Sequence, residues 1–553
     1  MSKTEVVNNP LSILLISVSS PEHYALWNAL SIETLAGDIK GTFGNKVQVR
    51  INRIRQNTDI DVVIENLDPA TGIIGISVEL GSLLLIKVLV ERLKTHLKSQ
   101  NFKPTIVFGN TIPTYQPDLF FDIWPSAIVV RGEGEFSFRG IVNHLLNNKR
   151  LDEIPSLVFR KDGVKVSTRF TPPDLTLLKH SPTLDTINEV LSCNGSALME
   201  TSRGCPWSRC SYCSIASFRN GRKWESLPLE RIRENLIKLI DAGVQEIEFT
   251  DADFMGGRSI EHTERIQQLS KIIRDVSLFY NKQISFRVFL TPQILYRPED
   301  EEGNIRIKKA LESLKAAGMS KVYLGVESGC QSQINRYKKG SKLSAHSHVI
   351  NMLRKEIGCE IDFGFLLFDP NLTLKEMSSD IKFFKDQDLL RGNQWPFRPI
   401  RVVHDTPLHK TLLEAGQLGE FDENLLNYSY SFSDKKVQII ADIVDNLSAE
   451  TREIFYAVKT ISKLQISPGK QTKAAICALD IVKENALIYL DLMEALEKQI
   501  KKKIPDIEPY KQLARKHIDN LIKKTKHEVE KGLLIEHADF LLQRIKEYQE
   551  LKQ

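Results

Sequence analysis

The chain is poor in cysteine and has no uninterrupted apolar stretch long enough for a membrane span. Seven cysteines in 553 residues are few and odd in number, which argues against a disulfide scaffold and is typical of a reducing compartment. The longest apolar stretches, such as Ile73–Val90, are broken by Gly, Ser, Glu and Lys. The N-terminal residues lack the charged-then-apolar pattern of a signal peptide. We therefore expect a cytoplasmic protein with no membrane partner.

A large excess of one charge is also missing. The 75 Lys and Arg residues nearly balance the 70 Asp and Glu residues, and no basic stripe with interleaved aromatic residues is present. We therefore expect no nucleic-acid partner. The apolar content of 42% and the charged content of 26% are those of an ordinary globular protein. The length predicts about three or four domains, since domains are roughly 100–200 residues long.

Residues 1–150 alternate strand and helix patterns and are predicted to form a doubly wound, Rossmann-like α/β domain. Continuous apolar runs of this kind suit strands that are buried on both faces of a parallel sheet. A helical pattern over 83–97 lies between two of them. Ligands of such sheets bind beyond the carboxyl ends of the strands. The predicted strands are Leu11–Val18, Gly72–Val78, Pro104–Phe108 and Ala127–Val130.

Residues 151–185 read as a linker with a small hairpin, whose turn is Asp162-Gly163. Residues 186–424 again alternate strands with helices, and their six units predict a partial (β/α)6 barrel of the TIM type. Its chemistry is expected at the carboxyl ends of the strands. The predicted barrel strands are Ala197–Thr201, Glu246–Thr250, Ile284–Leu290, Lys321–Val326, Glu360–Phe368 and Arg398–Val403.

Residues 425–553 are predicted to form a C-terminal all-α bundle. Glycine and proline nearly vanish after Gly469, and Lys, Glu and Leu dominate with a helical apolar period. The predicted helices are Thr451–Leu464, Lys473–Gln499, Glu508–Glu528 and His537–Lys552.

Three cysteines follow the first barrel strand closely: Cys205, Cys210 and Cys213. Three thiolates on one loop can hold three irons of a cubane cluster and leave the fourth iron open, whereas a closed cluster normally takes four cysteines. A structural zinc site needs four closed ligands, and no second CxxC or HxxxH pair is present. A redox CxxC would stand without a third cysteine upstream. The triplet therefore predicts a [4Fe-4S] cluster with an open corner.

A cluster loop at the start of a six-unit βα barrel resembles the radical S-adenosylmethionine (SAM) superfamily. The usual triplet of this superfamily has three residues between its first two cysteines, and this chain has four. The resemblance implies a [4Fe-4S] cluster, SAM, and an electron donor such as a flavodoxin or ferredoxin. The bound SAM would be cleaved by one electron to give a 5′-deoxyadenosyl radical, which abstracts a hydrogen from the substrate.

The same resemblance assigns SAM-binding residues around the barrel. Tyr212 matches the aromatic residue that these enzymes place against adenine, and Glu327, in Gly325-Val-Glu-Ser-Gly329, matches a carboxylate that bonds SAM. Asp369-Pro370 and Thr406-Pro407-Leu408 resemble turns of the family after strands five and six. The remaining cofactor-binding residues implied in this way are Thr250, Asp251, Arg287 and Ser328.

The N-terminal domain resembles the cobalamin-binding domain that precedes the barrel in one large branch of the superfamily. The segment Val130–Glu135 matches the usual sheet-exit motif of that branch. The Asp-x-His-x-x-Gly loop that supplies a histidine to cobalt is missing, and the sequence around His23 does not fit it. Cobalamin is therefore a candidate cofactor, but its absence is the favoured interpretation.

The spare cysteines bear on what becomes of the substrate radical. With cobalamin, the radical would take a methyl group; without it, a thiol could return a hydrogen to the opposite face of a peptide Cα and convert an L- to a D-residue. Cys330 lies just after Glu327, on the catalytic face, and is the first candidate for the hydrogen donor. Cys359, before strand five, is the second. Cys193 precedes strand one, and Cys477 is expected in the helical core.

The arrangement as a whole resembles the radical SAM epimerases that act on proteusin-type ribosomal precursor peptides. This resemblance implies a precursor peptide with a leader as the substrate and partner. The alternative is a cobalamin-dependent C-methyltransferase acting on a peptide or another natural product. A third interpretation, a plain iron–sulfur electron carrier, is disfavoured because it would fill the fourth cluster position. Arg398, Arg401 and His404 are expected to cap strand six rather than contact substrate.

Overall fold

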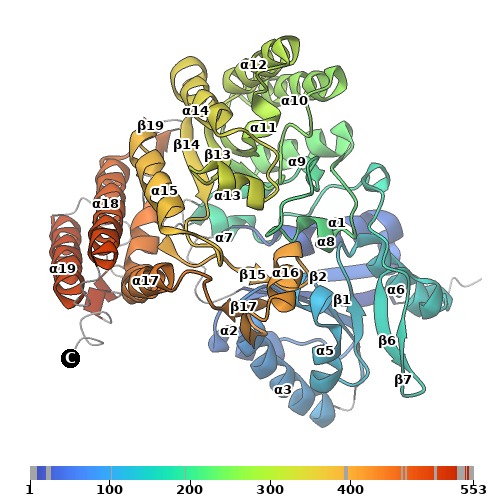
Figure 1. The fold of residues 1–553 in the computed structure, drawn as a ribbon. Coiled ribbons are helices and arrows are strands. Elements are labelled where there is room, and N and C mark those ends of the chain that lie inside the picture. The colour runs from blue at the N-terminus through green and yellow to red at the C-terminus, as the bar shows by residue number, and fades with distance from the viewer. Residues whose placement is uncertain are drawn as a thin grey trace, which may run out of the picture.

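The computed structural model describes residues 9–19, 27–100, 102–192, 195–390, 397–461, 465–467, 470–502, 507–531, 542–543 and 545–546. An N-terminal sheet, a partial barrel and a set of long C-terminal helices follow one another along the chain (Figure 1). The α/β fold class expected from the sequence is confirmed, with parallel sheets and a helical C-terminal part.

The N-terminal sheet has seven strands in the order β2-β1-β3-β4-β5-β6-β7, of which the first five are parallel. The hairpin expected in the linker is present, but it belongs to this sheet, because β6 pairs antiparallel with β5. β2 was not anticipated, since polar residues interrupt its apolar ones and most of the strand is not fully buried. The strands are β1 (Leu11–Val18), β2 (Val47–Ile54), β3 (Thr71–Val78), β4 (Thr105–Gly109), β5 (Ile128–Val130), β6 (Leu157–Lys161) and β7 (Val164–Ser167).

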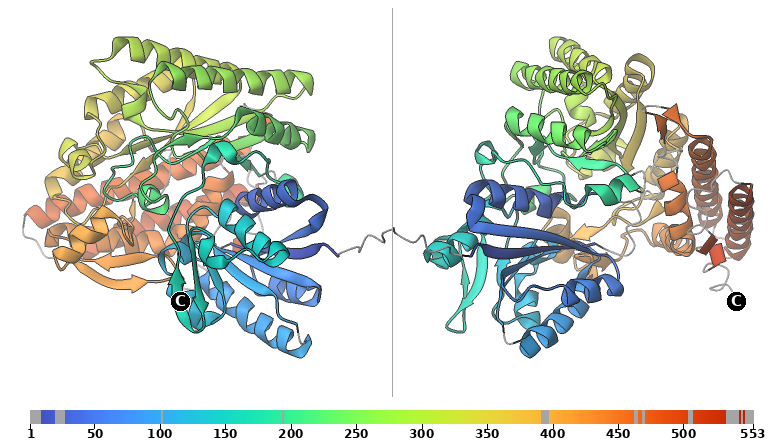
Figure 2. Two further views of the ribbon diagram at one scale, coloured as in Figure 1. Left: turned by 90° about the vertical axis from the view of Figure 1, so that its right-hand side faces the viewer. Right: turned by 180° about the vertical axis from the view of Figure 1, so that it is seen from behind.

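Helices cover both faces of this sheet (Figure 2). One apolar cluster joins the sheet to α2, α3 and α5, and a second joins the other face to α1 and α6. The strand order reverses between β1 and β3, which is where sheets of this type bind ligands. The helices are α1 (Leu30–Phe43), α2 (Asn57–Glu65), α3 (Leu83–Gln100), α4 (Thr111–Tyr115), α5 (Pro117–Ile123) and α6 (Glu135–Asn147).

The barrel sheet has five parallel strands in the order β8-β11-β12-β13-β14. They are β8 (Ala197–Met199), β11 (Glu246–Phe249), β12 (Ser285–Leu290), β13 (Met319–Glu327) and β14 (Glu360–Phe365). Helices pack on the outside of the sheet and share its apolar core. Its outer and connecting helices are α7 (Ile187–Ser192), α9 (Leu229–Asp241), α10 (Ile260–Phe279), α11 (Pro292–Leu295), α12 (Glu301–Ala316), α13 (Gln331–Arg336), α14 (Leu343–Asn351) and α15 (Leu374–Asp386).

The sixth predicted strand does not join this sheet in the described part of the chain. One isolated bridge links Phe368 to Pro399, and β15 (Val402–Val403) pairs instead with β17 (Asn427–Tyr430). Pro399 has no N–H group to donate, which limits ladder pairing there. β16 (Leu418–Asp422), which follows α16 (Pro407–Glu414), completes this three-stranded antiparallel sheet. The all-helical region was expected to begin at residue 425, but β17 still lies beyond that point.

Three long helices follow: α17 (Lys435–Ile461), α18 (Lys473–Lys501) and α19 (Glu508–Glu530). A short hairpin, β18 (Gln465–Ser467) with β19 (Lys470–Gln471), connects the first two. α18 packs between α17 and α19, and Figure 1 shows these helices beside the barrel. The fourth predicted helix, 537–552, lies mostly outside the described residues. None of the helices described combines the length and apolarity needed to cross a bilayer.

Candidate functional site

The cysteine triplet lies on one loop at the barrel mouth, between β9 (Ser202–Arg203) and α8 (Ile215–Phe218). Cys205, Cys210 and Cys213 are free thiols, and burial raises the pKa of all three, that of Cys210 to about 12. Among the described residues, no three Cys, His, Asp or Glu side chains converge on a single metal ion. A cubane cluster binds each thiolate through a different iron, so the loop is suited to a cluster rather than to one ion.

Glu327 ends β13 next to this loop in a strained backbone conformation. Its φ is +69°, and its carboxylate accepts a 2.8 Å hydrogen bond from the Lys339 ammonium. Burial alone would lower the pKa of Lys339, but the Glu327 carboxylate and the nearby Cys210 and Cys205 together outweigh it, and the pKa is raised. Gly325 leaves the room for this pair, because a Cβ there would lie 2.8 Å from Glu327 Oε1 and 2.9 Å from Lys339 Nζ. The sequence analysis did not predict Lys339 as a site residue, although it is buried and paired with Glu327.

Tyr212 stands on the cluster loop close to Glu327. Burial raises the pKa of the Tyr212 phenol well above its usual value, and the neighbouring Glu327 carboxylate raises it further. The ring meets Tyr337 edge-on, with centroids 5.5 Å apart. The structure therefore brings together the cluster cysteines, Tyr212 and Glu327, and the contact of Tyr212 with adenine stays a prediction.

Asp251 is buried beneath the start of the cluster loop. Its carboxylate accepts hydrogen bonds from the backbone N–H and the hydroxyl of Thr201 and from the Ser202 hydroxyl. Burial raises the pKa of Asp251 to about 6. Asp253, two residues on, has the same pKa for the same reason and bonds Thr291 at 2.6 Å. Thr250, between the strand and Asp251, is exposed.

Two other predicted SAM ligands have different surroundings. The Ser328 hydroxyl is fully buried within hydrogen-bond distance of both Asp380 (2.8 Å) and Gln333 (2.7 Å), so it holds the β13 exit against α15. Arg287 forms ion pairs with Glu248 at 3.0 Å and Asp362 at 3.5 Å inside the barrel. It is in register with Lys321, which is about 20 Å along the strand from Glu327 at 3.3 Å per residue. The structure does not bring Arg287 to the strand ends.

The candidate hydrogen donors lie at opposite ends of the sheet. The Cys330 thiol contacts the Ser332 hydroxyl at 3.2 Å, and Ser332 in turn bonds Glu376 of α15. No contact found for Cys330 in the described chain reaches Tyr212 or the cluster cysteines. Cys359 is buried near the beginning of β14, next to the Met319 carbonyl, and burial raises its pKa to about 11. That end of the barrel is remote from the cluster loop.

The two other spare cysteines add nothing to the site. Cys193 is outside the described residues. Cys477 lies on α18 and is half-buried against the apolar core, as expected.

A buried ion network ties the N-terminal domain to the cluster loop. Arg203, directly before that loop, pairs with Glu135 at 2.6 Å and with Glu200 at 2.7 Å. Arg219, directly after α8, pairs with Glu133 at 2.7 Å. Glu133 and Glu135 belong to the sheet-exit motif singled out in the sequence. The motif therefore serves, at least in part, to dock the two domains.

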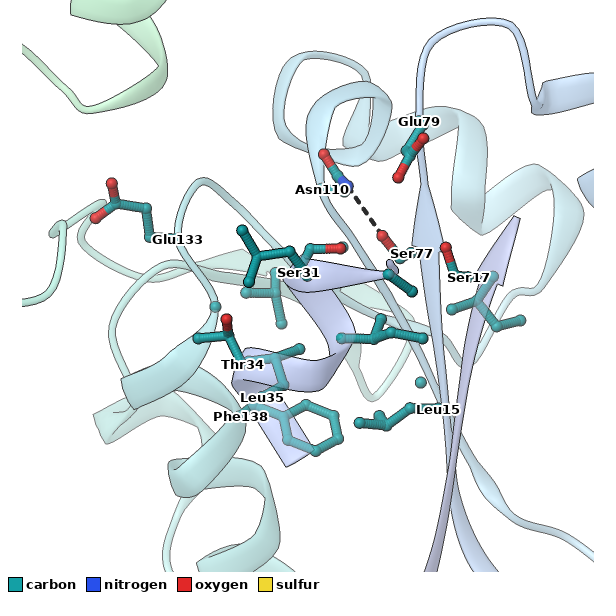
Figure 3. Close-up of a pocket in the computed structure, with 18 of the residues that line it drawn as sticks. Leu15, Ser17, Ser31, Thr34, Leu35, Ser77, Glu79, Asn110, Glu133 and Phe138 are labelled. Carbon is teal, nitrogen blue, oxygen red and sulfur yellow. Dashed lines mark hydrogen bonds between the residues drawn. The ribbon is translucent and has the colours of Figure 1, made fainter. Parts of the chain in front are cut away.

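A cavity of about 500 Å³ opens at the same junction, beyond the carboxyl ends of β1, β3, β4 and β5. Leu15, Leu35 and Phe138 form its apolar floor in Figure 3, and Gly75 leaves the floor open, since a Cβ there would lie 2.8 Å from Leu15.

The walls and mouth of the cavity are polar. Hydroxyl groups of Ser17, Ser31, Thr34 and Ser77 line the walls, and Asn110 donates a 2.9 Å hydrogen bond to Ser77 (Figure 3). Arg203, Glu133 and Glu135 of the ion network also line the cavity. It contains no histidine among the described lining residues, and His23 lies outside the described chain.

Comparisons with known proteins support the superfamily resemblance over the barrel. Residues 199–384 match the family model of the Radical SAM superfamily. The chain is 27% identical over 354 residues to 4'-phospho-dehydrooxetanocin synthase of Priestia megaterium, covering 62% of this chain and 46% of that protein. It thus spans less than half of the length of this relative. It is 26% identical to an uncharacterized methyltransferase of Pyrococcus horikoshii, over 60% of this chain and 67% of the relative.

The fold is shared along almost the whole chain with a solved structure. The cobalamin-dependent S-adenosylmethionine radical enzyme OxsB, with aqua-cobalamin and S-adenosylmethionine bound, superposes with a TM-score of 0.82. The match covers 98% of this chain and 84% of OxsB, at 19% identity. An identity this low shows the shared fold alone.

Proposed function

We propose that the protein is a cobalamin-dependent radical SAM enzyme that transfers a methyl group to a carbon atom of its substrate. The observation that carries this proposal is the cavity at the strand ends of the N-terminal domain, which is closed on one side by the residues that flank the cluster loop. The similarity to OxsB, whose structure contains cobalamin, and to a methyltransferase supports it.

The cavity residues fit cobalamin. The apolar floor around Leu15 and Phe138 suits the flat aromatic base of the nucleotide tail, and the wall hydroxyls suit its ribose and phosphate. Glu79 and Asn110 at the mouth suit the amide groups of the corrin ring. Bound cobalamin would supply a methyl group. This fit does not require a cobalt-ligating histidine, so the missing Asp-x-His-x-x-Gly loop does not exclude cobalamin.

The barrel residues fit a [4Fe-4S] cluster and SAM. Cys205, Cys210 and Cys213 would hold the cluster, and Glu327, Lys339 and Tyr212 offer a charged pair and an aromatic face beside it. Cluster and SAM together would supply the radical that activates the substrate carbon. The protein orients these groups and keeps water out. An external electron donor, such as a flavodoxin or ferredoxin, belongs to this proposal.

Methyl transfer replaces the epimerisation expected from the sequence. None of the relatives compared above is named as a peptide epimerase, and the Pyrococcus horikoshii relative is named as a methyltransferase, which favours the methyltransferase alternative. The contacts of Cys330 lead toward α15 and not toward the cluster loop. The precursor peptide stays a prediction without a supporting observation.

Two serine-to-tryptophan variants, one inside the cavity and one outside it, test the proposal. Ser31→Trp would place an indole in the cavity from the exposed side of α1, whereas Ser99→Trp adds the same group on the exposed end of α3. Both proteins are reconstituted with iron, sulfide and hydroxocobalamin without oxygen, and methyl-deuterated SAM is supplied. We expect the wild type and Ser99→Trp to retain corrinoid and to transfer labelled methyl to candidate substrates, and Ser31→Trp to do neither. Retention of corrinoid by all three proteins would contradict the cavity assignment.

A further inference from the structure

Three consecutive carbonyls at the end of α13 are bound by the cluster loop. The Ser211 hydroxyl donates to Arg336 O at 3.2 Å, and the Ser211 N–H donates to Tyr337 O at 2.9 Å. The indole N–H of Trp207 donates to Lys338 O at 2.7 Å. The cluster loop and the turn that follows α13 are therefore one connected unit.

Trp207 also covers this turn with its ring. Gly340 has a φ of +72°, and a Cβ on it would overlap the indole, so the close approach requires glycine. Trp207 lies between Cys205 and Cys210, in the first gap of the triplet, which has one residue more than the usual superfamily spacing. The long gap thus has a structural counterpart, the contact between Trp207 and the 338–340 turn.

The opposite side of the turn is anchored to the exit of β14. Arg336 pairs with Asp369 at 2.8 Å and with Glu376 at 3.0 Å, and the Tyr337 hydroxyl donates to Asp369 at 3.0 Å. Between these two anchors the chain directs Lys339 inward. Its side chain is 4% exposed, and its ammonium donates to Glu327 at 2.8 Å.

We propose that Trp207 is a positioning residue, which fixes the 338–340 turn on the cluster loop and thereby holds the Lys339 ammonium against Glu327. The inference rests on the proposed cluster and SAM site, and not on the reaction that follows. The net charge around an iron–sulfur cluster helps to set its reduction potential. A cation held in place beside the cluster loop therefore favours the reduced cluster, and one that has moved away does not.

The first test measures the affinity for SAM in anaerobically reconstituted protein. Trp207→Ala should weaken SAM binding by about tenfold, which corresponds to the loss of one well-placed polar interaction. Trp207→Phe keeps a ring but loses the N–H group, so its loss should be smaller. Trp124→Phe is the control, because it removes an indole hydrogen bond to Ser126 in the N-terminal domain and should bind SAM like the wild type.

The second test measures the reduction potential of the cluster without SAM. Lys339→Met and Trp207→Ala should both lower the potential. In the Lys339→Met background, Trp207→Ala should change it no further, because Trp207 acts through Lys339. Additive shifts in the double variant would overturn the proposal.

A glycine pair separates the contact from backbone strain. Gly340→Ala and Gly358→Ala both place alanine at a φ of +72°, but nothing lies within 4 Å of the Cβ at 358. We expect both variants to lose thermal stability through the positive φ, Gly340→Ala to lose more because its Cβ also overlaps the indole, and only Gly340→Ala to lose SAM affinity. If the wild type holds neither cluster nor SAM, the proposed function fails. A second outcome is that the wild type holds both the cluster and SAM while all three variants bind SAM as tightly as it does. In that case the positioning role is wrong. The three variants are Trp207→Ala, Trp207→Phe and Gly340→Ala. The iron content of each variant shows whether the cluster is still bound. If Trp207→Ala loses the cluster, the SAM affinity of Trp207→Phe is used to test the positioning role instead.

Discussion

Removal of Arg203 should show how strongly the two domains depend on their shared ion network. The guanidinium pairs with Glu135 and Glu200 and lies 3.8 Å from Glu133, and the side chains of all four residues are at most 14% exposed. Removing one partner of a buried ion pair costs about 3–5 kcal/mol, because the remaining charge is left uncompensated. Arg219 still pairs with Glu133 and Arg231 with Glu200, so Arg203→Met should lie near the lower limit, at about 3 kcal/mol.

The assay is thermal unfolding followed by circular dichroism. A cooperative unit of 150–250 residues loses roughly 2–4 °C of melting temperature per kcal/mol, so the midpoint of Arg203→Met should fall by roughly 6–12 °C. Arg150→Met is the matched control, because Arg150 is 68% exposed in its pair with Asp152 and solvent screens such a pair, so the midpoint should hardly change. Adding Glu135→Gln to Arg203→Met should recover part of the loss, since it removes the carboxylate that has lost its cation.

The loss should also depend on pH. Burial raises the pKa of Glu133, and Arg203 is the first of the cations that lower it, so the variant raises this pKa further. A carboxyl whose folded pKa exceeds its unfolded value binds more protons when folded, so stability falls as the pH rises. The deficit of Arg203→Met should therefore be larger in alkaline than in mildly acidic buffer. A midpoint within 1 °C of the Arg150→Met control, or no recovery with Glu135→Gln, would refute this reasoning.

Three further predictions follow from the site. Cys330→Ser should retain the SAM cleavage and product formation of the wild type, measured by chromatography and mass spectrometry; loss of product with intact SAM cleavage would restore the thiol as a hydrogen donor. Gly325→Ala should weaken SAM binding while cluster content is kept, because its Cβ would lie 2.8 Å from Glu327 Oε1; unchanged affinity in a titration would exclude Glu327 as a ligand. Asp251 and Asp253 have pKa values raised by burial from 3.8 to about 6, so the folded protein holds their protons longer and these two groups contribute less stability as the pH rises across this window; the melting temperature of the wild type relative to Asp253→Asn should therefore fall with rising pH there, and a difference that rises instead would contradict the burial of these carboxyls.

The parts of the fold that could be predicted from the sequence are those with strong local patterns. The apolar run Leu11–Val18 matches β1 at both ends, and the Asp162-Gly163 turn connects β6 and β7 as expected. β2 was not predicted because polar residues interrupt its apolar pattern, as in Arg50-Ile51-Asn52-Arg53. The prediction of a sixth barrel strand was wrong, because strand propensity does not show which strand is the pairing partner. In the structure β15 pairs with β17 instead of with the barrel sheet.

The candidate site could be predicted where a motif names its residues, and not where tertiary contacts select them. Cys205 was predicted from the spacing of the cysteine triplet, and Tyr212 and Glu327 from the resemblance of their segments to motifs of the superfamily. Lys339 is an ordinary lysine beside Lys338 in the sequence, and only the docking of the 338–340 turn on Trp207 shows which of the two is buried. The N-terminal cavity could not be predicted from the sequence either, since Gly75 and Phe138, which form its floor, belong to separate elements.

The claim that cobalamin occupies the cavity beside the cluster loop is tested most directly by the visible spectrum of the reconstituted protein after gel filtration. The account predicts that a corrinoid spectrum stays with the wild-type chain in stoichiometric amount and is absent from Ser31→Trp. A wild-type chain that carries its iron–sulfur cluster and binds SAM but retains no corrinoid would contradict it.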